Sequence, residues 1–172
     1  AEERVILVDA DDREVGTLEK LAAHERGGVR HRAFSVFIVD ARGRWLLQRR
    51  AEGKYHFPRL WTNACCSHPR PGESTASAAH RRLREELGFD CPLTERFQFE
   101  YKAASAAEGL VEHELDHVFT GTHRGAIHPN PDEVGQVRWV ELAELENEVK
   151  AHPETFTPWF KIALERVKEI IQ

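Results

Sequence analysis

Short runs of apolar residues, several of them alternating with polar ones, divide most of the chain into predicted strands. Residues 5–9 are predicted to form the first strand. The runs at 31–40 and 44–50 are joined by Ala41-Arg42-Gly43, which is typical of a hairpin turn. Further strands are expected at residues 95–102, 110–122 and 133–140. Most of the elements predicted up to residue 140 are therefore strands.

Helical spacing is found in the middle of the chain and again at its end. Residues 73–87 are predicted to form a helix that ends at Gly88. Two helical patterns close the chain, and the last places Phe160, Leu164, Val167 and Ile171 at spacings of four, three and four. Strands interrupted by one helix and followed by helices indicate an α+β fold, a mixed α/β sandwich with a mixed central sheet flanked by helices.

Length, charge and cysteine content narrow the class of protein. The 172 residues fit one domain spanning 1–172, and a net charge of −5 argues against a general nucleic-acid binder. The apolar run at 33–39 is far shorter than the ~20 residues of a membrane helix. Three cysteines, two of them adjacent, make a poor disulfide framework. We therefore expect a monomeric cytoplasmic protein with free thiols that binds neither nucleic acid nor membrane.

Residues 63–69 carry the first candidate chemistry. Alternate residues of an extended strand point to one face, so Cys66 and His68 are expected to project together while Cys65 points the other way. A thiol beside a potential metal ligand is a strong candidate for a site, and Cys66 is the better candidate for its thiol. Cys65 is then a small buried apolar residue.

The predicted helix at 73–87 carries charged residues at a characteristic spacing. They follow the pattern E-x7-R-x3-E-E-x-G, formed by Glu73, Arg81, Glu85, Glu86 and Gly88. This resembles the Nudix box, in which carboxylates gathered on one helical turn hold a divalent cation that grips a diphosphate. A helix of this kind, taken alone, is more often an amphipathic helix with a solvated charged face.

Two positions depart from the Nudix box. Ser67 stands where the box begins with Gly, and Arg82 replaces the first Glu of its Arg-Glu pair. The loss of that Glu removes a carboxylate that Nudix hydrolases use to activate water, and Arg supplies donors suited to phosphate oxygens. The substitution favours binding of a diphosphate over its hydrolysis.

A wider set of segments is similar to the type I isopentenyl-diphosphate delta-isomerases. In chain order they are Gly16-Thr17-Leu18-Glu19-Lys20, Ala22-Ala23-His24, His31-Arg32-Ala33-Phe34-Ser35, Gln48-Arg49-Arg50-Ala51, Lys54, Leu60-Trp61-Thr62-Asn63, Cys65-Cys66-Ser67-His68-Pro69, Val111-Glu112-His113-Glu114 and Phe156-Thr157-Pro158-Trp159-Phe160. The resemblance runs from about residue 5 to the last helix, and it accounts for Ser67 and Arg82. It implies a single Nudix-like domain that interconverts isopentenyl and dimethylallyl diphosphate in isoprenoid biosynthesis.

The reaction implied by this resemblance needs two acid–base groups. One carbon of the alkene gains a proton and another loses one two carbons away, with a positive charge on the skeleton between the steps. The resemblance assigns these roles to Cys66 and Glu114, with Tyr101 hydrogen-bonded near Glu114. It places the face of Trp159 against the cationic intermediate. From the residues alone, Tyr101 is more simply an ordinary strand residue and Trp159 equally well a core aromatic.

The resemblance also implies two metal sites. Glu112 and Glu114 share one face of a strand, and His113 points the other way. Ten histidines are present, so any one of them is more often a core or surface residue than a ligand. The resemblance selects a single Mn²⁺, Zn²⁺ or Mg²⁺ site formed by His24, His31, His68, Glu112 and Glu114. It adds a Mg²⁺ at Glu86 that bridges to the diphosphate.

Cationic side chains are needed to bind the diphosphate. Each of them, taken singly, is more often a solvated surface charge, but together they would form a local anion site that the net charge conceals. The positions that the resemblance implies are Lys20, Arg50, Lys54 and Arg82, with a hydrogen bond from Ser35.

Two other functions compete with the isomerase. A Nudix pyrophosphohydrolase acting on a nucleoside diphosphate derivative would share the helix, but Arg82 and the thiol–imidazole pair of Cys66 and His68 count against it. A non-catalytic metal-dependent binding module would not need both acid–base groups. Release of phosphate from nucleotides would favour the hydrolase.

Overall fold

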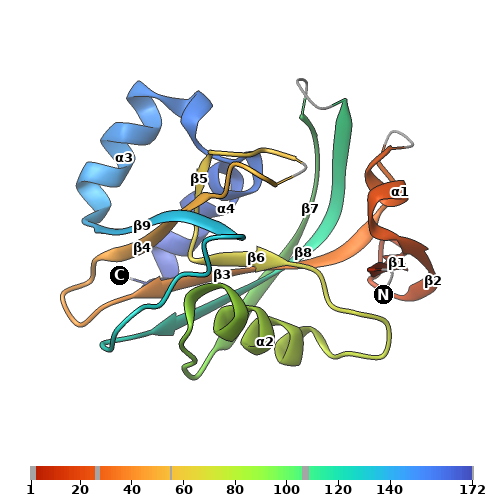
Figure 1. Cartoon of the computed structure of the whole chain (residues 1–172), viewed down its shortest axis with the longest axis horizontal. Coiled ribbons are helices and arrows are strands. Elements are labelled where there is room, and N and C mark those ends of the chain that lie inside the picture. Colours follow the sequence, from red (N-terminus) through yellow and green to blue (C-terminus); the bar gives the residue numbers. More distant parts are fainter. Residues whose placement is uncertain (1–2, 26–27, 55, 106–108, 172) are drawn as a thin grey trace.

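A mixed β-sheet forms the centre of the computed structural model of the chain (Figure 1). The structure describes residues 3–25, 28–54, 56–105 and 109–171. Its strands are β1 Arg4–Val8, β2 Glu14–Glu19, β3 His31–Val39, β4 Trp45–Arg50, β5 Trp61–Thr62, β6 Cys65–Ser67, β7 Thr94–Ser105, β8 Leu110–Thr122 and β9 Val134–Val140. Its helices are α1 Lys20–Glu25, α2 Thr75–Leu87, α3 Leu142–Ala151, α4 Pro158–Ile171 and the 3₁₀ turn η1 Pro153–Thr155.

Strand β3 is the central strand of the sheet. It pairs in parallel with β8 along its whole length, from His31 opposite Glu114 to Val39 opposite Thr122. Its other edge pairs antiparallel with β1, β6 and β4 in turn. Nearly every residue of β3 is buried, as expected for a strand covered on both faces.

Alternate residues of β3 contribute to two hydrophobic cores on opposite faces of the sheet. Phe34, Val36 and Ile38 pack in the core that contains the buried face of α2. Phe37 and Val39 pack in the core that contains α4. Figure 1 shows α2 on one side of the sheet and α4 on the other. In the part of the chain that the structure describes, no helix has both the length and the apolar character of a membrane span.

The predicted fold class is confirmed. The elements predicted from the sequence differ from the observed ones mainly where the elements are short. The strands predicted at 31–40, 44–50 and 110–122 are present, with ends that shift by one residue at most. The middle helix begins at Thr75 and not at Glu73, because the Ser74 hydroxyl caps it by accepting from the Ser77 N–H at 3.1 Å. Strands β2 and β5 and helix α1 were not predicted from the sequence.

Gly88 ends α2 in a conformation that only glycine adopts without strain. Its φ is +70°, and its N–H donates to the Arg84 carbonyl. A Cβ at this position would lie 2.7 Å from Cβ and 2.9 Å from the carbonyl oxygen of His128. Gly72 also has a positive φ, of +82°, but a Cβ there would meet nothing within 4 Å.

We expect Gly88→Ala to destabilise the protein more than Gly72→Ala. Left-handed strain costs roughly 1–2 kcal/mol at both positions, and only Gly88→Ala adds a clash with the backbone of His128. The free energy of unfolding in urea measures both effects. Equal losses of stability in the two variants would contradict a role for the close approach of His128.

Candidate active site

The register of three neighbouring strands places the first site residues in one row. Tyr101 of β7 lies opposite Glu114 of β8, and Glu114 lies opposite His31 of β3. On the other edge of β3, Ser35 lies opposite Cys66 of β6. Cys66 and Glu114 therefore lie on strands that flank β3 on its two sides.

Five metal-ligating side chains converge beside this row. Their ligand atoms all lie within 4.8 Å of one another, and the residues are His24, His31, His68, Glu112 and Glu114. Nε2 of His31 and Nε2 of His68 lie 3.2 and 2.6 Å from the same Glu114 oxygen, Oε2. Nε2 of His24 contacts Oε1 of Glu112. The structure therefore brings together the five residues that were predicted to form one cluster.

The remaining ring nitrogens of two of these histidines are held by the backbone. Nδ1 of His24 lies 2.7 Å from the Lys20 carbonyl oxygen, and Nδ1 of His31 lies 2.8 Å from that of Val29. Since a carbonyl only accepts, both Nδ1 atoms carry the proton and leave Nε2 with its lone pair toward the cluster. Backbone acceptors of this kind fix the tautomer of metal-binding histidines.

Burial and the neighbouring charged groups shift the pKa values of His31, His68 and Glu112 in this cluster. Burial disfavours a charge on His31, but its hydrogen bond to Glu114 and the negative charge of that carboxylate outweigh this and raise the His31 pKa. For His68, burial dominates and lowers the pKa well below its usual value. The pKa values of the two imidazoles that share one carboxylate oxygen are therefore shifted in opposite directions. Burial acts to raise the Glu112 pKa, but hydrogen bonding within the cluster and the imidazoles of His56 and His24 hold it well below its ordinary value.

These five residues fit a divalent cation. The carboxylates are almost completely buried, at 2% and 5% exposure, and buried anions are stable only when they are paired or coordinate a metal. The neighbour His113 lies on the opposite face of β8, where its Nε2 is 2.8 Å from an exposed Glu100 oxygen. The predicted division of the strand into a ligand face and an outer face is therefore seen.

The cavity beside the cluster brings together the predicted thiol and three of the four predicted cations, without Arg82. Its lining residues are Lys20, Arg50, Lys54, His56, Cys66, Ser67, His68, Glu112, Glu114 and Trp159. Cys65 points away, into the core under α2, with no exposed surface. Burial raises the Cys66 pKa to about 12, although the nearby Arg50 guanidinium acts to lower it. At neutral pH this side chain is a thiol that has a proton to give.

Two aromatic side chains lie beside these groups, and of the two only Trp159 lines the cavity. The Tyr101 hydroxyl donates to Oε1 of Glu114, and burial followed by the charge of Glu114 raises the Tyr101 pKa well above its usual value. Tyr101 is therefore a neutral donor. Trp159, at the start of α4, is 3% exposed, and the guanidinium carbon of Arg50 lies 5.4 Å from the centre of its ring. The face of this indole already accommodates a cation.

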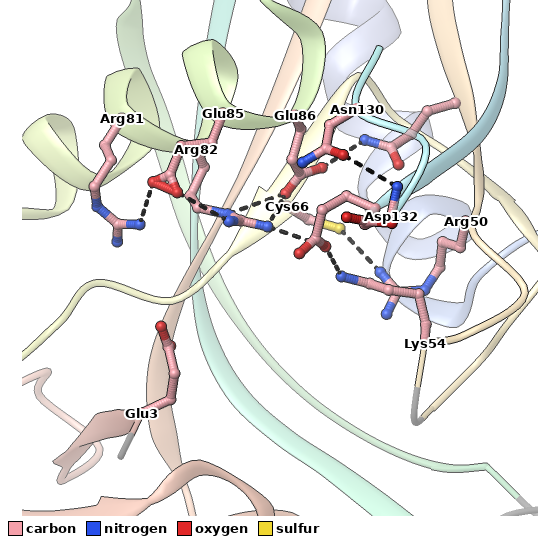
Figure 2. A network of polar contacts seen from close by, with 12 residues as sticks. Glu3, Arg50, Lys54, Cys66, Arg81, Arg82, Glu85, Glu86, Asn130 and Asp132 are labelled. Atoms are coloured by element: carbon pink, nitrogen blue, oxygen red, sulfur yellow. Dashed lines mark hydrogen bonds and ion pairs between the residues drawn. The ribbon is translucent and has the colours of Figure 1, made fainter. Parts of the chain in front are cut away.

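The cationic side chains Arg50, Lys54 and Arg82 lie around Cys66 (Figure 2). Burial lowers the Lys20 pKa, and repulsion from Lys54 and Arg82 adds to the effect while nearby carboxylates oppose it. The Arg50 guanidinium is held by the carbonyls of His56 and Phe57 at 3.2 and 3.1 Å. The predicted basic residues thus share one region, in which an anion would relieve their mutual repulsion.

Two predicted residues take part in contacts within the protein. Glu86, which is 3% exposed, accepts from Arg82 Nη2 at 2.7 Å and from Gln48 Nε2 at 2.9 Å. The Ser35 hydroxyl donates to Oδ2 of Asp116 at 2.8 Å, and Ser35 does not line the cavity. The predicted Mg²⁺ ligation by Glu86 and substrate contact by Ser35 remain predictions.

Sequence reasoning missed two residues of this region. His56 lines the cavity, and its Nε2 lies 2.7 Å from Oε1 of Glu112. Glu133 contacts both Lys54 and Arg82. His56 is two residues from the predicted Lys54, which was the only available signal, and nothing near Glu133 in the sequence marks it as part of a site.

Comparison with known proteins identifies first the class and then the family. Residues 29–160 match the NUDIX domain family. The fold is similar to that of a MutT protein from Methanosarcina mazei, with a TM-score of 0.68 at 20% identity, covering 81% of this chain and 94% of that one. A structure from Deinococcus radiodurans gives a TM-score of 0.71 at 22% identity, covering 87% and 90%. The chain therefore has a Nudix fold.

Two curated relatives define the family more narrowly. Isopentenyl-diphosphate Delta-isomerase 2 of Aromatoleum aromaticum is 52% identical over 166 residues, which cover 96% of this chain and 87% of the relative. The isopentenyl-diphosphate Delta-isomerase of Nocardia farcinica is 50% identical over 161 residues, covering 94% and 92%. The chain belongs to the isopentenyl-diphosphate delta-isomerase family.

We expect Glu112→Gln to weaken binding of a divalent cation to the protein, and His113→Gln to leave it unchanged. Both residues lie on β8, but only Glu112 faces the cluster. Loss of a carboxylate that also orients His24 lowers the metal affinity by at least ~10–100-fold. Metal content after dialysis, measured by plasma mass spectrometry, gives the ratio of ion to chain. Full occupancy in Glu112→Gln, or equal loss in His113→Gln, would contradict the assignment of the cluster.

Proposed function

We propose that the chain catalyses the reversible 1,3-allylic rearrangement of isopentenyl diphosphate to dimethylallyl diphosphate, a step of isoprenoid biosynthesis. The observation that carries the proposal is that Cys66 and Glu114, from strands on the two sides of β3, line one cavity. An allylic proton shift needs two acid–base groups that reach different carbons of one substrate. The names of the relatives point to the same reaction.

Cys66 and Glu114 are suited to complementary parts of this reaction. The thiol is protonated at neutral pH, and the Glu114 carboxylate is fixed by the Tyr101 hydroxyl and by Nε2 of His68 at 2.6 Å. Tyr101 remains neutral and donates a hydrogen bond to Oε1 of Glu114. Each group can thus give or accept a proton without movement of the strands that carry it.

A divalent cation held by His24, His31, His68, Glu112 and Glu114 would neutralise the buried carboxylates and set the basicity of Glu114. Three imidazoles among five ligands favour Zn²⁺ over Mg²⁺ at this position. A Mg²⁺ would be held by the carboxylate of Glu86 together with the oxygens of the diphosphate. The diphosphate itself would bind to Lys20, Arg50, Lys54 and Arg82.

Trp159 is placed to stabilise the positive charge that develops between the two proton transfers. Its ring lines the cavity beside Cys66 and packs against Tyr101, with the ring centres 6.2 Å apart. A cation over a desolvated indole gains up to about 2 kcal/mol.

Hydrolysis of a nucleoside diphosphate derivative is the competing function of this fold. Arg82 stands where the Nudix box has a metal-binding Glu, and its guanidinium is engaged by Glu85, Glu86 and Glu133. A cation at this position opposes the binding of a metal that would activate water.

The three free cysteines, one of them facing the cavity, support a reducing cytoplasmic location.

Cys66→Ala and Glu114→Gln are each expected to lower the isomerisation rate by about 10²–10⁴-fold, the usual contribution of a general acid or base. Cys65→Ala is the matched control, because this neighbouring thiol points into the core. Proton NMR of isopentenyl diphosphate in D₂O with Mg²⁺ follows the appearance of dimethylallyl diphosphate with deuterium in a methyl group.

Retention of more than about a tenth of the rate, a loss of only ~1.4 kcal/mol, in either active-site variant would overturn the assignment. Unchanged substrate with the wild-type protein, together with phosphate release from nucleotides, would establish the hydrolase instead.

Trp159→Leu is expected to lower the isomerisation rate at least about tenfold more than Trp159→Phe, since only the latter keeps an aromatic face. Both changes enlarge the cavity, and a thermal unfolding scan corrects for any loss of stability. Equal rates in the two variants would show that Trp159 acts only through packing.

A further inference from the structure

Glu133 is an acidic residue among the cations that are proposed to bind the diphosphate. It lies directly before β9, and its side chain is 27% exposed. Its Oε2 contacts Nζ of Lys54 and lies 3.2 Å from Nη2 of Arg82. One carboxylate oxygen thus bridges two of the four basic residues.

The backbone on both sides of Glu133 is fixed. Its N–H donates to the Asn130 carbonyl at 3.0 Å, and its carbonyl accepts from the Ala51 N–H at 3.1 Å. The Asn130 N–H in turn donates to the backbone carbonyl of Glu86 at 2.8 Å. The loop is therefore tied to α2 at Glu86 and to the end of β4, so the position of Glu133 among the cations is built into the fold.

The charges around Glu133 favour its ionised form. Burial acts to raise the pKa of Glu133, but its hydrogen bond to Lys54 and the charges of Lys54 and Arg82 lower it below the usual value. Glu133 and Glu86 both contact Nη2 of Arg82, at 3.2 and 2.7 Å. Arg82 is thus neutralised by the protein itself in the absence of an anion.

We propose that Glu133 is an internal competitor for the diphosphate donors, and that it makes the site select the Mg²⁺ complex of a diphosphate over the free anion. The inference rests on the proposed function, since it takes Lys54 and Arg82 as diphosphate ligands. A free diphosphate must displace the Glu133 carboxylate from both cations and then remains beside its negative charge. A Mg²⁺ bound to the diphosphate offsets that repulsion and gives the displaced carboxylate a new partner.

Inorganic pyrophosphate is the probe that tests this selectivity. Its dissociation constant is measured by titration calorimetry with protein whose His–Glu cluster has been loaded with one equivalent of Zn²⁺, with and without Mg²⁺ in the buffer. We expect Glu133→Gln to bind free pyrophosphate about tenfold more tightly than the wild type, because the amide keeps the shape but loses the charge. Binding of the Mg²⁺ complex should change less, so the preference for Mg²⁺ falls.

Two further variants separate this effect from a general change of charge. Asp132→Asn removes the same charge from the adjacent exposed residue and should bind free pyrophosphate as the wild type does. Glu133→Asp keeps the charge and should retain the preference for Mg²⁺. Unfolding scans establish that each variant is folded.

Each outcome bears on the inference. No gain in free pyrophosphate affinity in Glu133→Gln, or an equal gain in Asp132→Asn, would overturn the competitor role while leaving the diphosphate site intact. Weaker binding of only the Mg²⁺ complex in Glu133→Gln would show instead that Glu133 is simply a Mg²⁺ ligand. Failure of the wild type to bind pyrophosphate with Mg²⁺ would overturn the diphosphate site and the inference together.

Discussion

The parallel pairing of β3 with β8 is the constraint on which the rest of the site depends. It places His31 beside Glu114 and orients Glu112 and Glu114 toward one face of the sheet. Because side chains alternate along a strand, a slip of one residue would move both carboxylates to the other face and replace them by His113. The buried residues of β3, divided between the cores under α2 and α4, make such a slip costly. Hydrophobic packing thereby fixes the geometry of a charged site that contributes little apolar packing of its own.

The site contains buried carboxylates and cations whose charges are neutralised only in part by other groups of the protein. Two buried carboxylates lie against imidazoles on one side, and buried or half-buried cations repel one another on the other side. Buried charge without a partner is unfavourable, so such clusters are retained where they bind something. A metal ion would balance the first group, and in the proposed function a diphosphate would balance the second. The cavity between them is lined by residues of both groups together with Cys66 and Trp159.

The sequence predicted the long elements and the local geometry well. The alternation that separates Cys66 from Cys65, and Glu112 and Glu114 from His113, needs only the two-residue period of a strand. Helix α1 was missed because six residues cannot show helical periodicity, although it carries two predicted site residues. That His24 would meet Glu112 came from the resemblance, since residues 88 positions apart are brought together only by the sheet. His56 and Glu133 were missed because their contacts are likewise distant in sequence. His56 contacts Glu112, 56 positions away, and Glu133 contacts Lys54, 79 positions away.

The exchange of one charge on α2 explains how a hydrolase fold supports a different reaction. Where the Nudix box has a carboxylate, Arg82 forms ion pairs with Glu85 and Glu86 on its own helix. These pairs leave fewer anionic oxygens on α2 to hold a metal that activates water. The strong metal-binding set lies instead across β3, β8, α1 and the segment after β6, on the opposite face of the sheet from the core of α2. In the proposed function, this separation leaves α2 to bind the diphosphate without cleaving it, while residues of the strands transfer protons at the hydrocarbon end.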